Sequence, residues 1–317
     1  MIDQYDRKIN YMRLSVTDRC NLRCKYCMPE KGICKKSHQD ILRLEEMIKI
    51  VKAGAALGIE KVRLTGGEPL IRKGIVSLIK TINEVDGINE VTMTTNGILL
   101  EEMLDDLHDA GLKRINLSLD TLDADRYKTV TRGGELSRVI DVIPKILSYG
   151  MKLKINVVLI GGFNDDEIVD FVNLTYKGID IRFIELMPIG EASTWSKDKY
   201  ISNKKVLEVV ELEEAQRFDI HSPAKYYRLA GADGLVGLIN PISCSFCENC
   251  NRIRITSDGK IKPCLHTDEE IDLIQAMRND QPILELMRKA ITNKPKEHLM
   301  KDESFEPIKR DMNTIGG

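Results

Sequence analysis

Cys20-Asn-Leu-Arg-Cys24-Lys-Tyr-Cys27 places three cysteines within eight residues, shortly after the apolar run Met12–Val16. Extended backbone spans about 3.3–3.6 Å per residue, so one loop can bring three thiolates to a small site. Iron–sulfur clusters are usually bound by four cysteine thiolates, and a cluster held by three keeps one iron open. Structural zinc normally takes a fourth ligand at similar spacing. The loop therefore predicts an iron–sulfur site, with a zinc loop or a redox thiol group as alternatives, and Cys34 stands apart from it.

Composition describes an ordinary globular protein. The chain has 317 residues, of which 42% are hydrophobic, enough for one large domain with a smaller appendage or for two domains. The net charge of −2 provides no basic field for nucleic acid, so an anionic substrate would have to be bound by local arginines and lysines. We find neither a signal peptide nor an apolar stretch of about 18–20 residues, and we expect a cytoplasmic protein without a membrane partner. In that compartment eight cysteines favour metal ligands over disulfides.

Strand-like and helix-like segments alternate after the cysteine loop at roughly 30-residue intervals. Strands are expected at 61–65, 90–95, 114–119, 152–159 and 180–186, and helices at 44–57, 75–85, 99–110, 136–149 and 165–176. This alternation predicts right-handed βαβ units and a parallel sheet. With the apolar run Met12–Val16 as the first strand there are six such units. Six are too few for a closed eight-unit TIM barrel, so the expected α/β fold is a partial, open (β/α)6 barrel.

Unusual loops follow several of these strands. They are the cysteine loop, Thr65-Gly-Gly-Glu-Pro69, Asn96-Gly97, Ser118-Leu-Asp120 and Met187-Pro188. The carboxyl ends of parallel strands form the ligand-binding face in such folds, so these loops are predicted to converge on one rim.

The pattern changes after residue 190. A charged, helix-like run covers 204–216, with Glu213 and Glu214 expected on its solvated face, and a domain boundary is expected near residue 220. Beyond it, Cys247, Cys250 and Cys264 have the spacing of a metal site, and a hairpin turning at Asp258-Gly259 would bring Cys264 back to Cys250. Zinc and iron both fit this spacing. Cys244 could add a fourth thiolate and close the site to substrate.

Several basic residues lie where their neighbours are apolar. Arg13, Arg63 and Lys154 sit in strand-like runs, where a buried charge needs a partner. That partner could be a carboxylate, with Glu68, Asp120 and Glu185 as candidates, or it could be a bound anion. Arg252 and Arg254 alternate and would share one strand face beside the second cysteine group. Neither a P-loop nor a Gly-x-Gly-x-x-Gly motif is present.

The segment from Ser15 to Pro29, with its three cysteines, resembles the cluster loop of the radical S-adenosylmethionine (SAM) superfamily. It is most similar to the GTP 3′,8-cyclase family of molybdenum cofactor biosynthesis. The similarity extends from Tyr11 to the terminal Gly316-Gly317 and includes Cys-x-x-Cys-x-Arg-x-Arg from Cys247. It implies a radical SAM barrel over residues 1–220 and a C-terminal domain over 221–317, with a [4Fe–4S] cluster in each.

The resemblance also implies roles for individual residues. Cys20, Cys24 and Cys27 would bind the first cluster and Cys247, Cys250 and Cys264 the second; Tyr26, Gly67, Ser118 and Met187 would bind SAM; Arg13, Arg63, Thr94, Lys154, Arg252 and Arg254 would bind GTP; Gly316 and Gly317 would reach the reaction centre. Arg182 is a further candidate for GTP.

The implied reaction converts GTP to (8S)-3′,8-cyclo-7,8-dihydro-GTP through a 5′-deoxyadenosyl radical that takes the C3′ hydrogen. The implied partners are a flavodoxin-type electron donor, the cyclic pyranopterin monophosphate synthase that follows in the pathway, and a second copy of the chain. Two other hypotheses remain open. One is a peptide-modifying radical SAM maturase with an auxiliary cluster. The other is a zinc-ribbon protein that binds nucleic acid, although aromatic residues make up only 5% of the chain.

Overall fold

A single curved sheet organises the molecule. The computed structural model describes residues 1–33, 36–216, 219–244, 246–298, 300, 308 and 310–316. The strand order is β12-β11-β10-β1-β2-β3-β4-β5-β6-β9-β8-β7, and β10, β1 to β6 and β9 all run parallel. The two edges, β12 and β7, do not pair with each other, so the barrel stays open. The partial TIM-like barrel is therefore confirmed.

The strands β2 to β6 match the predicted segments to within one residue. The strands of the sheet are β1 Tyr11–Ser15, β2 Lys61–Thr65, β3 Glu90–Thr95, β4 Arg114–Ser118, β5 Lys152–Leu159, β6 Asp180–Glu185, β7 Glu213–Glu214, β8 Ala224–Arg228, β9 Val236–Ile239, β10 Arg252–Ile255, β11 Lys260–Lys262 and β12 Ile271–Asp272. The hairpin of β10 and β11 is confirmed, with Gly259 at φ +73 in its turn. The sequence did not predict that β9 and β10 would extend the parallel sheet beyond six strands. Strands from both sides of residue 220 join this sheet, and the domain boundary there stays a prediction.

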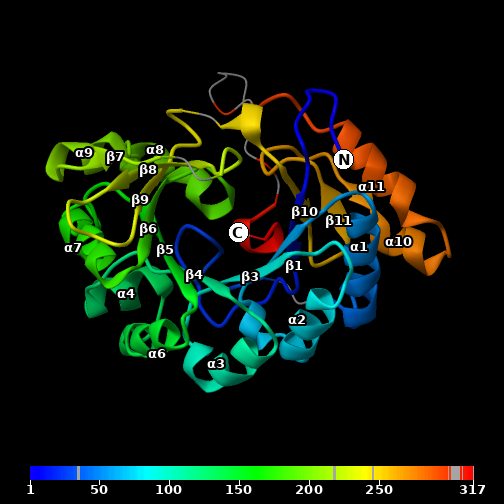
Figure 1. Ribbon diagram of the computed structural model, residues 1–317, viewed down its shortest axis with the longest axis horizontal. Coiled ribbons are helices and arrows are strands. Elements are labelled where there is room, and N and C mark those ends of the chain that lie inside the picture. The colour runs from blue at the N-terminus through cyan, green and yellow to red at the C-terminus, as the bar shows by residue number, and fades with distance from the viewer. Residues whose placement is uncertain are drawn as a thin grey trace.

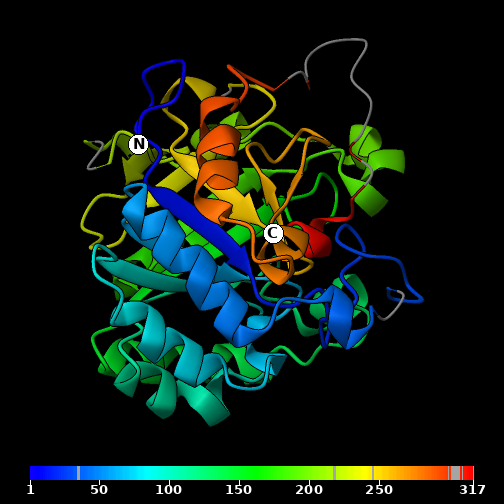
Figure 2. The ribbon, with the colours of Figure 1, turned by 90° about the vertical axis from the view of Figure 1, so that its right-hand side faces the viewer.

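Helices cover the outside of the sheet, and the C-terminus lies inside its curve (Figure 1). They are α1 Leu44–Ala56, α2 Ile75–Asn83, α3 Leu100–Asp109, α4 Ala124–Thr131, α5 Ser137–Ile140, α6 Ile143–Ser148, α7 Ile168–Asn173, α8 Ser196–Lys199, α9 Lys204–Val209, α10 Leu273–Arg278 and α11 Ile283–Thr292. The C-terminal helix α11 packs beside α1, which closes the outer layer next to β1 (Figure 2).

Three helix predictions need correction. The helix expected at 136–149 is two short helices, α5 and α6, because Pro144 lies in the first turn of α6 and cannot continue α5. The helix expected at 204–216 ends at Val209, and Glu213 and Glu214 form strand β7 against β8 rather than a helix face. The segment 165–176 is helical only as α7 followed by the 3-10 turn Leu174–Lys177.

The alternation of side chains along the strands separates the core from the lumen. Met12 and Leu14 of β1, like Val62 and Leu64 of β2, are fully buried toward the helices. The residues between them point into the barrel, since successive side chains of a strand face opposite sides. Many of these inward residues are polar or charged, so the hydrophobic core lies between sheet and helices and the lumen is free for a ligand. No helix in the described part of the chain is long and apolar enough to cross a membrane.

Candidate active site

One large cavity fills the lumen of the barrel. Its volume is about 900 Å³, at the upper end of the range for small-molecule sites. The strand-end loops predicted to converge do so, because Cys20, Gly67, Asn96, Ser118 and Met187 all line this cavity. The second cysteine group lines the same cavity.

The first cysteine loop presents three thiols to the cavity. Arg23 Nη1 donates to the backbone oxygen of Cys20 at 2.6 Å, and Arg132 Nη1 donates to that of Arg23 at 3.1 Å, which fixes the loop. Burial raises the pKa of Cys20 to about 11, and burial together with the neighbouring Cys20 thiol raises the pKa of Cys27 to about 12. A bound metal reverses this preference, because it stabilises thiolates directly. Three facing thiols in a cavity are therefore a donor set that fits a cluster with one open iron.

The Gly66-Gly67 pair packs against the cysteine loop. A Cβ atom on Gly67 would lie 2.1 Å from the backbone oxygen of Arg19, and Gly66 has φ +154. Gly67 N donates to Thr17 O at 2.8 Å, and Glu68 N donates to Arg19 O at 2.8 Å. We expected glycines here so that the backbone could approach a ligand. The structure adds a second reason, which is close contact between this turn and the cysteine loop.

Glu68 links the end of β2 to the end of β3 by hydrogen bonds. Its carboxylate accepts from Thr95 Oγ1 and from Asn96 N, both at 2.7 Å, and from Leu70 N at 3.0 Å. Burial nevertheless raises the pKa of Glu68 to about 7. The Asn96 side chain in turn donates to Cys20 Sγ at 3.7 Å, so the loop after β3 contacts the cysteine loop directly.

The predicted SAM residues gather beside the first cysteine group. Tyr26, Gly67, Ser118 and Met187 all line the cavity. Asp120, which the sequence placed in a rim loop and suggested as an ion-pair partner, organises this part: it accepts from Tyr26 Oη at 2.7 Å and from Val158 N at 2.8 Å. Burial raises the pKa of Asp120 to about 6. The Ser-Leu-Asp run at the end of β4 was the signal that could have identified it.

The second cysteine group lies at the other end of the strands. Cys250 comes just before β10 and Cys264 just after the antiparallel β11, so the hairpin brings them together as predicted. Burial would raise the pKa of Cys250, but the charges of Lys294 and Arg252 outweigh it and lower that pKa to about 7. Cys244 is exposed and does not line the cavity, which does not support its addition as a fourth thiolate.

The structure describes no group of three His, Cys, Asp or Glu side chains arranged around a single metal ion, within the residues whose placement is given. In a cluster each thiolate binds a different iron, so the sulfurs need not point at one centre. Each set of three cysteines fits this requirement. Cys34 and Gly317 lie outside the described residues.

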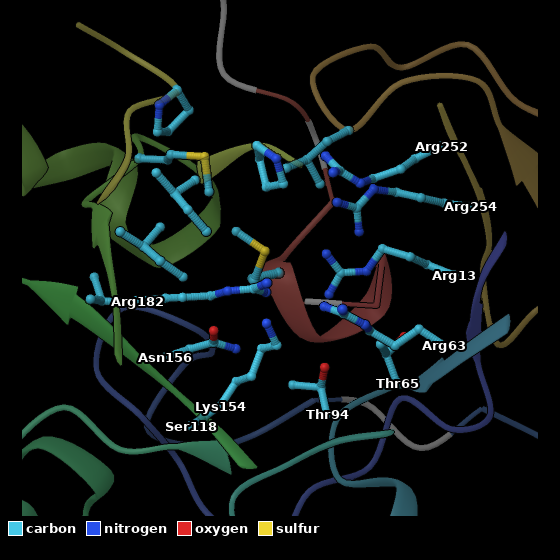
Figure 3. Close-up of a pocket in the computed structure, with 18 of the residues that line it drawn as sticks. Arg13, Arg63, Thr65, Thr94, Ser118, Lys154, Asn156, Arg182, Arg252 and Arg254 are labelled. Atoms are coloured by element: carbon cyan, nitrogen blue, oxygen red, sulfur yellow. The ribbon is translucent and has the colours of Figure 1, made fainter. Parts of the chain in front are cut away.

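Six basic side chains from five strands point into the cavity between the two cysteine groups. Figure 3 shows Arg13, Arg63, Arg252 and Arg254 on one side, facing Lys154 and Arg182 on the other. Strand register aligns them, since Arg13 pairs with both Arg63 and Arg254 in the parallel sheet. The candidates Thr94 and Arg182 also line the cavity.

Most of these cations have no carboxylate partner. Within the described chain, Arg13, Arg63, Arg182 and Arg252 form no ion pair. The alternative of salt bridges to Glu68, Asp120 or Glu185 is therefore wrong for Arg13 and Arg63. They hydrogen-bond to neutral groups instead: Arg182 Nη2 donates to Tyr226 Oη at 2.8 Å and Arg252 Nη2 to His221 O at 2.8 Å. Lys154 differs, because its Nζ pairs with Asp180 Oδ2 at 2.7 Å.

The six basic side chains shown in Figure 3 form a basic wall of the cavity, and the crowding of their like charges favours a bound anion. Burial and the neighbouring arginines lower the pKa of Arg63 to about 9 and that of Arg254 to about 10, and they hold the pKa of Arg13 well below its usual range. Arg13 Nε, Thr65 Oγ1 and Thr94 Oγ1 are buried without a hydrogen-bond partner among the described residues. Unpaired buried donors beside crowded cations fit a polyanionic ligand.

The C-terminal tail enters the lumen beside this wall. Gly316 has φ +76, and a Cβ there would lie 2.5 Å from Thr65 Oγ1. Its carbonyl oxygen accepts from Arg254 Nη1 at 3.2 Å. At the base of the tail, Arg310 pairs with Asp258 and with Glu270 at distances of 3.1 and 2.6 Å.

Comparison with known proteins agrees with this geometry. The family model for the radical SAM superfamily matches residues 14–175, and a model described as Molybdenum Cofactor Synthesis C matches residues 179–300. The boundary between the matches falls near β6, ahead of the second cysteine group.

Curated relatives match the chain over its full length. Proteins named GTP 3′,8-cyclase from Alkaliphilus oremlandii and Alkaliphilus metalliredigens are 55% and 56% identical, and one from Clostridium botulinum is 49% identical, each covering 100% of both chains. Among solved structures, Streptococcus suis SuiB bound to S-adenosylmethionine has a TM-score of 0.65 at 18% identity, over 97% of this chain and 77% of that one. At this identity the likeness concerns the fold alone.

Proposed function

Because the chain belongs to the GTP 3′,8-cyclase family of radical SAM enzymes, it acts in molybdenum cofactor biosynthesis, and we propose that its cavity converts GTP to (8S)-3′,8-cyclo-7,8-dihydro-GTP. The observation that carries this proposal is the shared cavity: two groups of three cysteines line it, and basic side chains lie between them. A peptide-modifying maturase would have no use for this concentration of cations inside the barrel.

The two cysteine groups would hold two [4Fe–4S] clusters. Cys20, Cys24 and Cys27 would bind the first, and Cys247, Cys250 and Cys264 the second. When bound with SAM, the first cluster supplies hydrogen-atom abstraction at C3′ of GTP by a 5′-deoxyadenosyl radical. The protein contributes binding, orientation and exclusion of competing reactions.

The walls of the first half of the cavity would receive SAM. Gly67, Ser118 and Met187 line the same space as the first cysteine group. The Asp120 carboxylate fixes the Tyr26 hydroxyl at 2.7 Å, so the tyrosine ring is held in place at the edge of the site.

The basic wall would bind the triphosphate. Arg13, Arg63, Lys154, Arg252 and Arg254 offer charged donors and Thr94 a hydroxyl, all directed into one volume. Arginine donors form charge-assisted bonds to phosphate oxygens that are about twice as strong as neutral ones. With the phosphates fixed there and the purine toward Cys250, the ribose would lie between the two ends of the cavity. Gly316 would approach it from the tail.

Further partners follow from the family. We propose a flavodoxin-type reductant, transfer of the product to cyclic pyranopterin monophosphate synthase, and a homodimer in the cytoplasm. The position of the boundary between the barrel, 1–220, and the C-terminal domain, 221–317, belongs to the same proposal.

Anaerobic reconstitution tests the assignment. The protein is loaded with iron and sulfide, the iron is counted, and SAM, a reductant and GTP are added. We expect about eight irons per chain and 5′-deoxyadenosine formation that depends on GTP. About four irons and no response to GTP would favour the maturase. Cys24→Ala should abolish SAM cleavage, whereas the control Cys244→Ala, at an exposed cysteine outside the cavity, should keep both the iron and the activity.

A further inference from the structure

Tyr11 occupies an unexpected place in the basic wall. It is the first residue of β1, and register pairs it with Arg252 on one side and Lys61 on the other. Like Arg13 two residues later, its side chain faces the lumen and lines the cavity. The residue is only 8% exposed. A tyrosine at the start of a strand is common, so nothing in the sequence distinguished it.

The surroundings of the ring are cationic. The guanidinium carbon of Arg63 lies 5.4 Å from the ring centroid and that of Arg252 lies 5.8 Å from it, both within the range of cation–π attraction. The aromatic ring therefore supports two of the guanidinium groups that we assign to the triphosphate. Such support matters because an arginine side chain is otherwise free to adopt many rotamers.

The Tyr11 hydroxyl is buried and has no hydrogen-bond partner among the described residues. Buried tyrosine hydroxyls usually have a partner, because an unmade hydrogen bond costs free energy. An anion between the two guanidinium groups would accept from this hydroxyl, and an O–H donor to a phosphate oxygen forms one of the stronger bonds available in proteins.

We propose that Tyr11 is a substrate-binding residue whose hydroxyl donates a hydrogen bond to the triphosphate of GTP while its ring holds Arg63 and Arg252 in position. This inference rests on the proposed function, since it needs a nucleoside triphosphate in the cavity. It assigns the hydroxyl to the phosphates rather than to the purine, because two phosphate-binding guanidinium groups lie against the ring.

Tyr11→Phe tests the hydroxyl alone, because it keeps the ring and its contacts with both arginines. In calorimetric titration of the anaerobically reconstituted protein, we expect the dissociation constant for GTP to rise about ten-fold, as for loss of one charge-assisted hydrogen bond. Tyr11→Leu also removes the ring, and we expect about a hundred-fold rise. The Phe variant should melt no lower than the wild type, since the lost hydroxyl has no protein partner in the described chain.

Tyr127→Phe is the matched control. Its hydroxyl is also buried without a described partner, but the residue lies in α4 and does not line the cavity. GTP affinity should be unchanged in this variant. Inorganic tripolyphosphate and guanosine separate the two parts of the substrate: Tyr11→Phe should weaken binding of the first and leave binding of the second unchanged.

Three results would overturn the inference. Equal GTP affinity of wild type and Tyr11→Phe would show that the Tyr11 hydroxyl does not contact GTP. If Tyr11→Phe loses as much affinity for guanosine as for GTP, the hydroxyl contacts the nucleoside and not the phosphates. Binding of GTP by the wild-type protein with both clusters present is measured before any variant is compared. If the wild-type protein does not bind GTP at all, the proposed function itself is rejected.

Discussion

Replacing Arg13 by methionine should stabilise the substrate-free protein and weaken its binding of GTP. Arg13 is half-buried beside Arg254, and its Nε is a buried atom without a hydrogen-bond partner among the described residues. Burial first, and then the charge of Arg254, hold the pKa of Arg13 well below its usual range. Methionine has a similar length and no charge, so it can fill the space without this cost.

The two effects can be sized separately. Replacing buried ion pairs by apolar side chains of similar volume often stabilises proteins by about 1–4 kcal/mol, and a gain of about 2 kcal/mol would raise the melting temperature of a chain of this length by roughly 3 °C. Loss of a buried charge-assisted contact to an anion costs about 2–4 kcal/mol, which is roughly a thirty-fold to thousand-fold weaker affinity for GTP.

Thermal unfolding with and without GTP measures both effects in one experiment. The stabilisation by GTP should shrink in Arg13→Met while the melting temperature without GTP rises. Arg138→Met is the control, because this arginine pairs with Glu102 on an exposed helix surface, and its variant should change neither quantity by more than about 0.5 kcal/mol. A variant that melts lower than wild type and binds GTP equally well would refute the assignment of Arg13 to an anion site.

Other residues give further tests. Arg254→Ala should keep both clusters but weaken GTP binding by about 2–3 kcal/mol in titration calorimetry; unchanged affinity would count against its phosphate role. Arg310→Met removes the ion pairs to Asp258 and Glu270 at the base of the tail and should lower kcat with little change in SAM affinity, unlike the exposed Arg288→Met. Burial raises the pKa of Glu68 from 4.5 to about 7, so the folded protein binds a proton at this carboxyl more tightly than the unfolded chain does. The resulting contribution to the free energy of unfolding is present below pH 4.5 and is lost as the pH rises through about 7. Glu68→Gln should flatten that decline in urea unfolding.

Much of the fold could be predicted because the strands carry local signals. The runs at β2, β3 and β5 begin and end where the sequence indicated, since β-branched residues alternate with the polar residues of the lumen. Helix α6 was misread because its apolar spacing continues that of α5, while Pro144 separates them. The pairing of β10 with β1 is a contact between distant segments, and no local pattern encodes it.

The residues of the site also differ in whether a local sequence pattern could identify them. Cysteine spacing predicted which thiols come together at the cavity, because residues that share a loop or a hairpin are close in sequence. Tyr11 and Asp120 could not be assigned in this way, since their importance comes from neighbours on other strands, such as Arg252 beside Tyr11. The ion pair of Lys154 with Asp180 was missed for the same reason.

Strand direction explains why the two cysteine groups can line one cavity and still lie apart. The first cysteine group follows the carboxyl end of β1, whereas Cys250 precedes the amino end of β10, and these two strands are parallel neighbours. The five residues of β1 span about 17 Å, so the two groups lie at opposite ends of the lumen. Arg13 of β1 and the alternating Arg252 and Arg254 of β10 lie along the length between them, which is where the proposed nucleotide would place its phosphates. Had the second group followed β10 instead, both cysteine groups would meet at one rim, and the basic wall would lie outside the space between them.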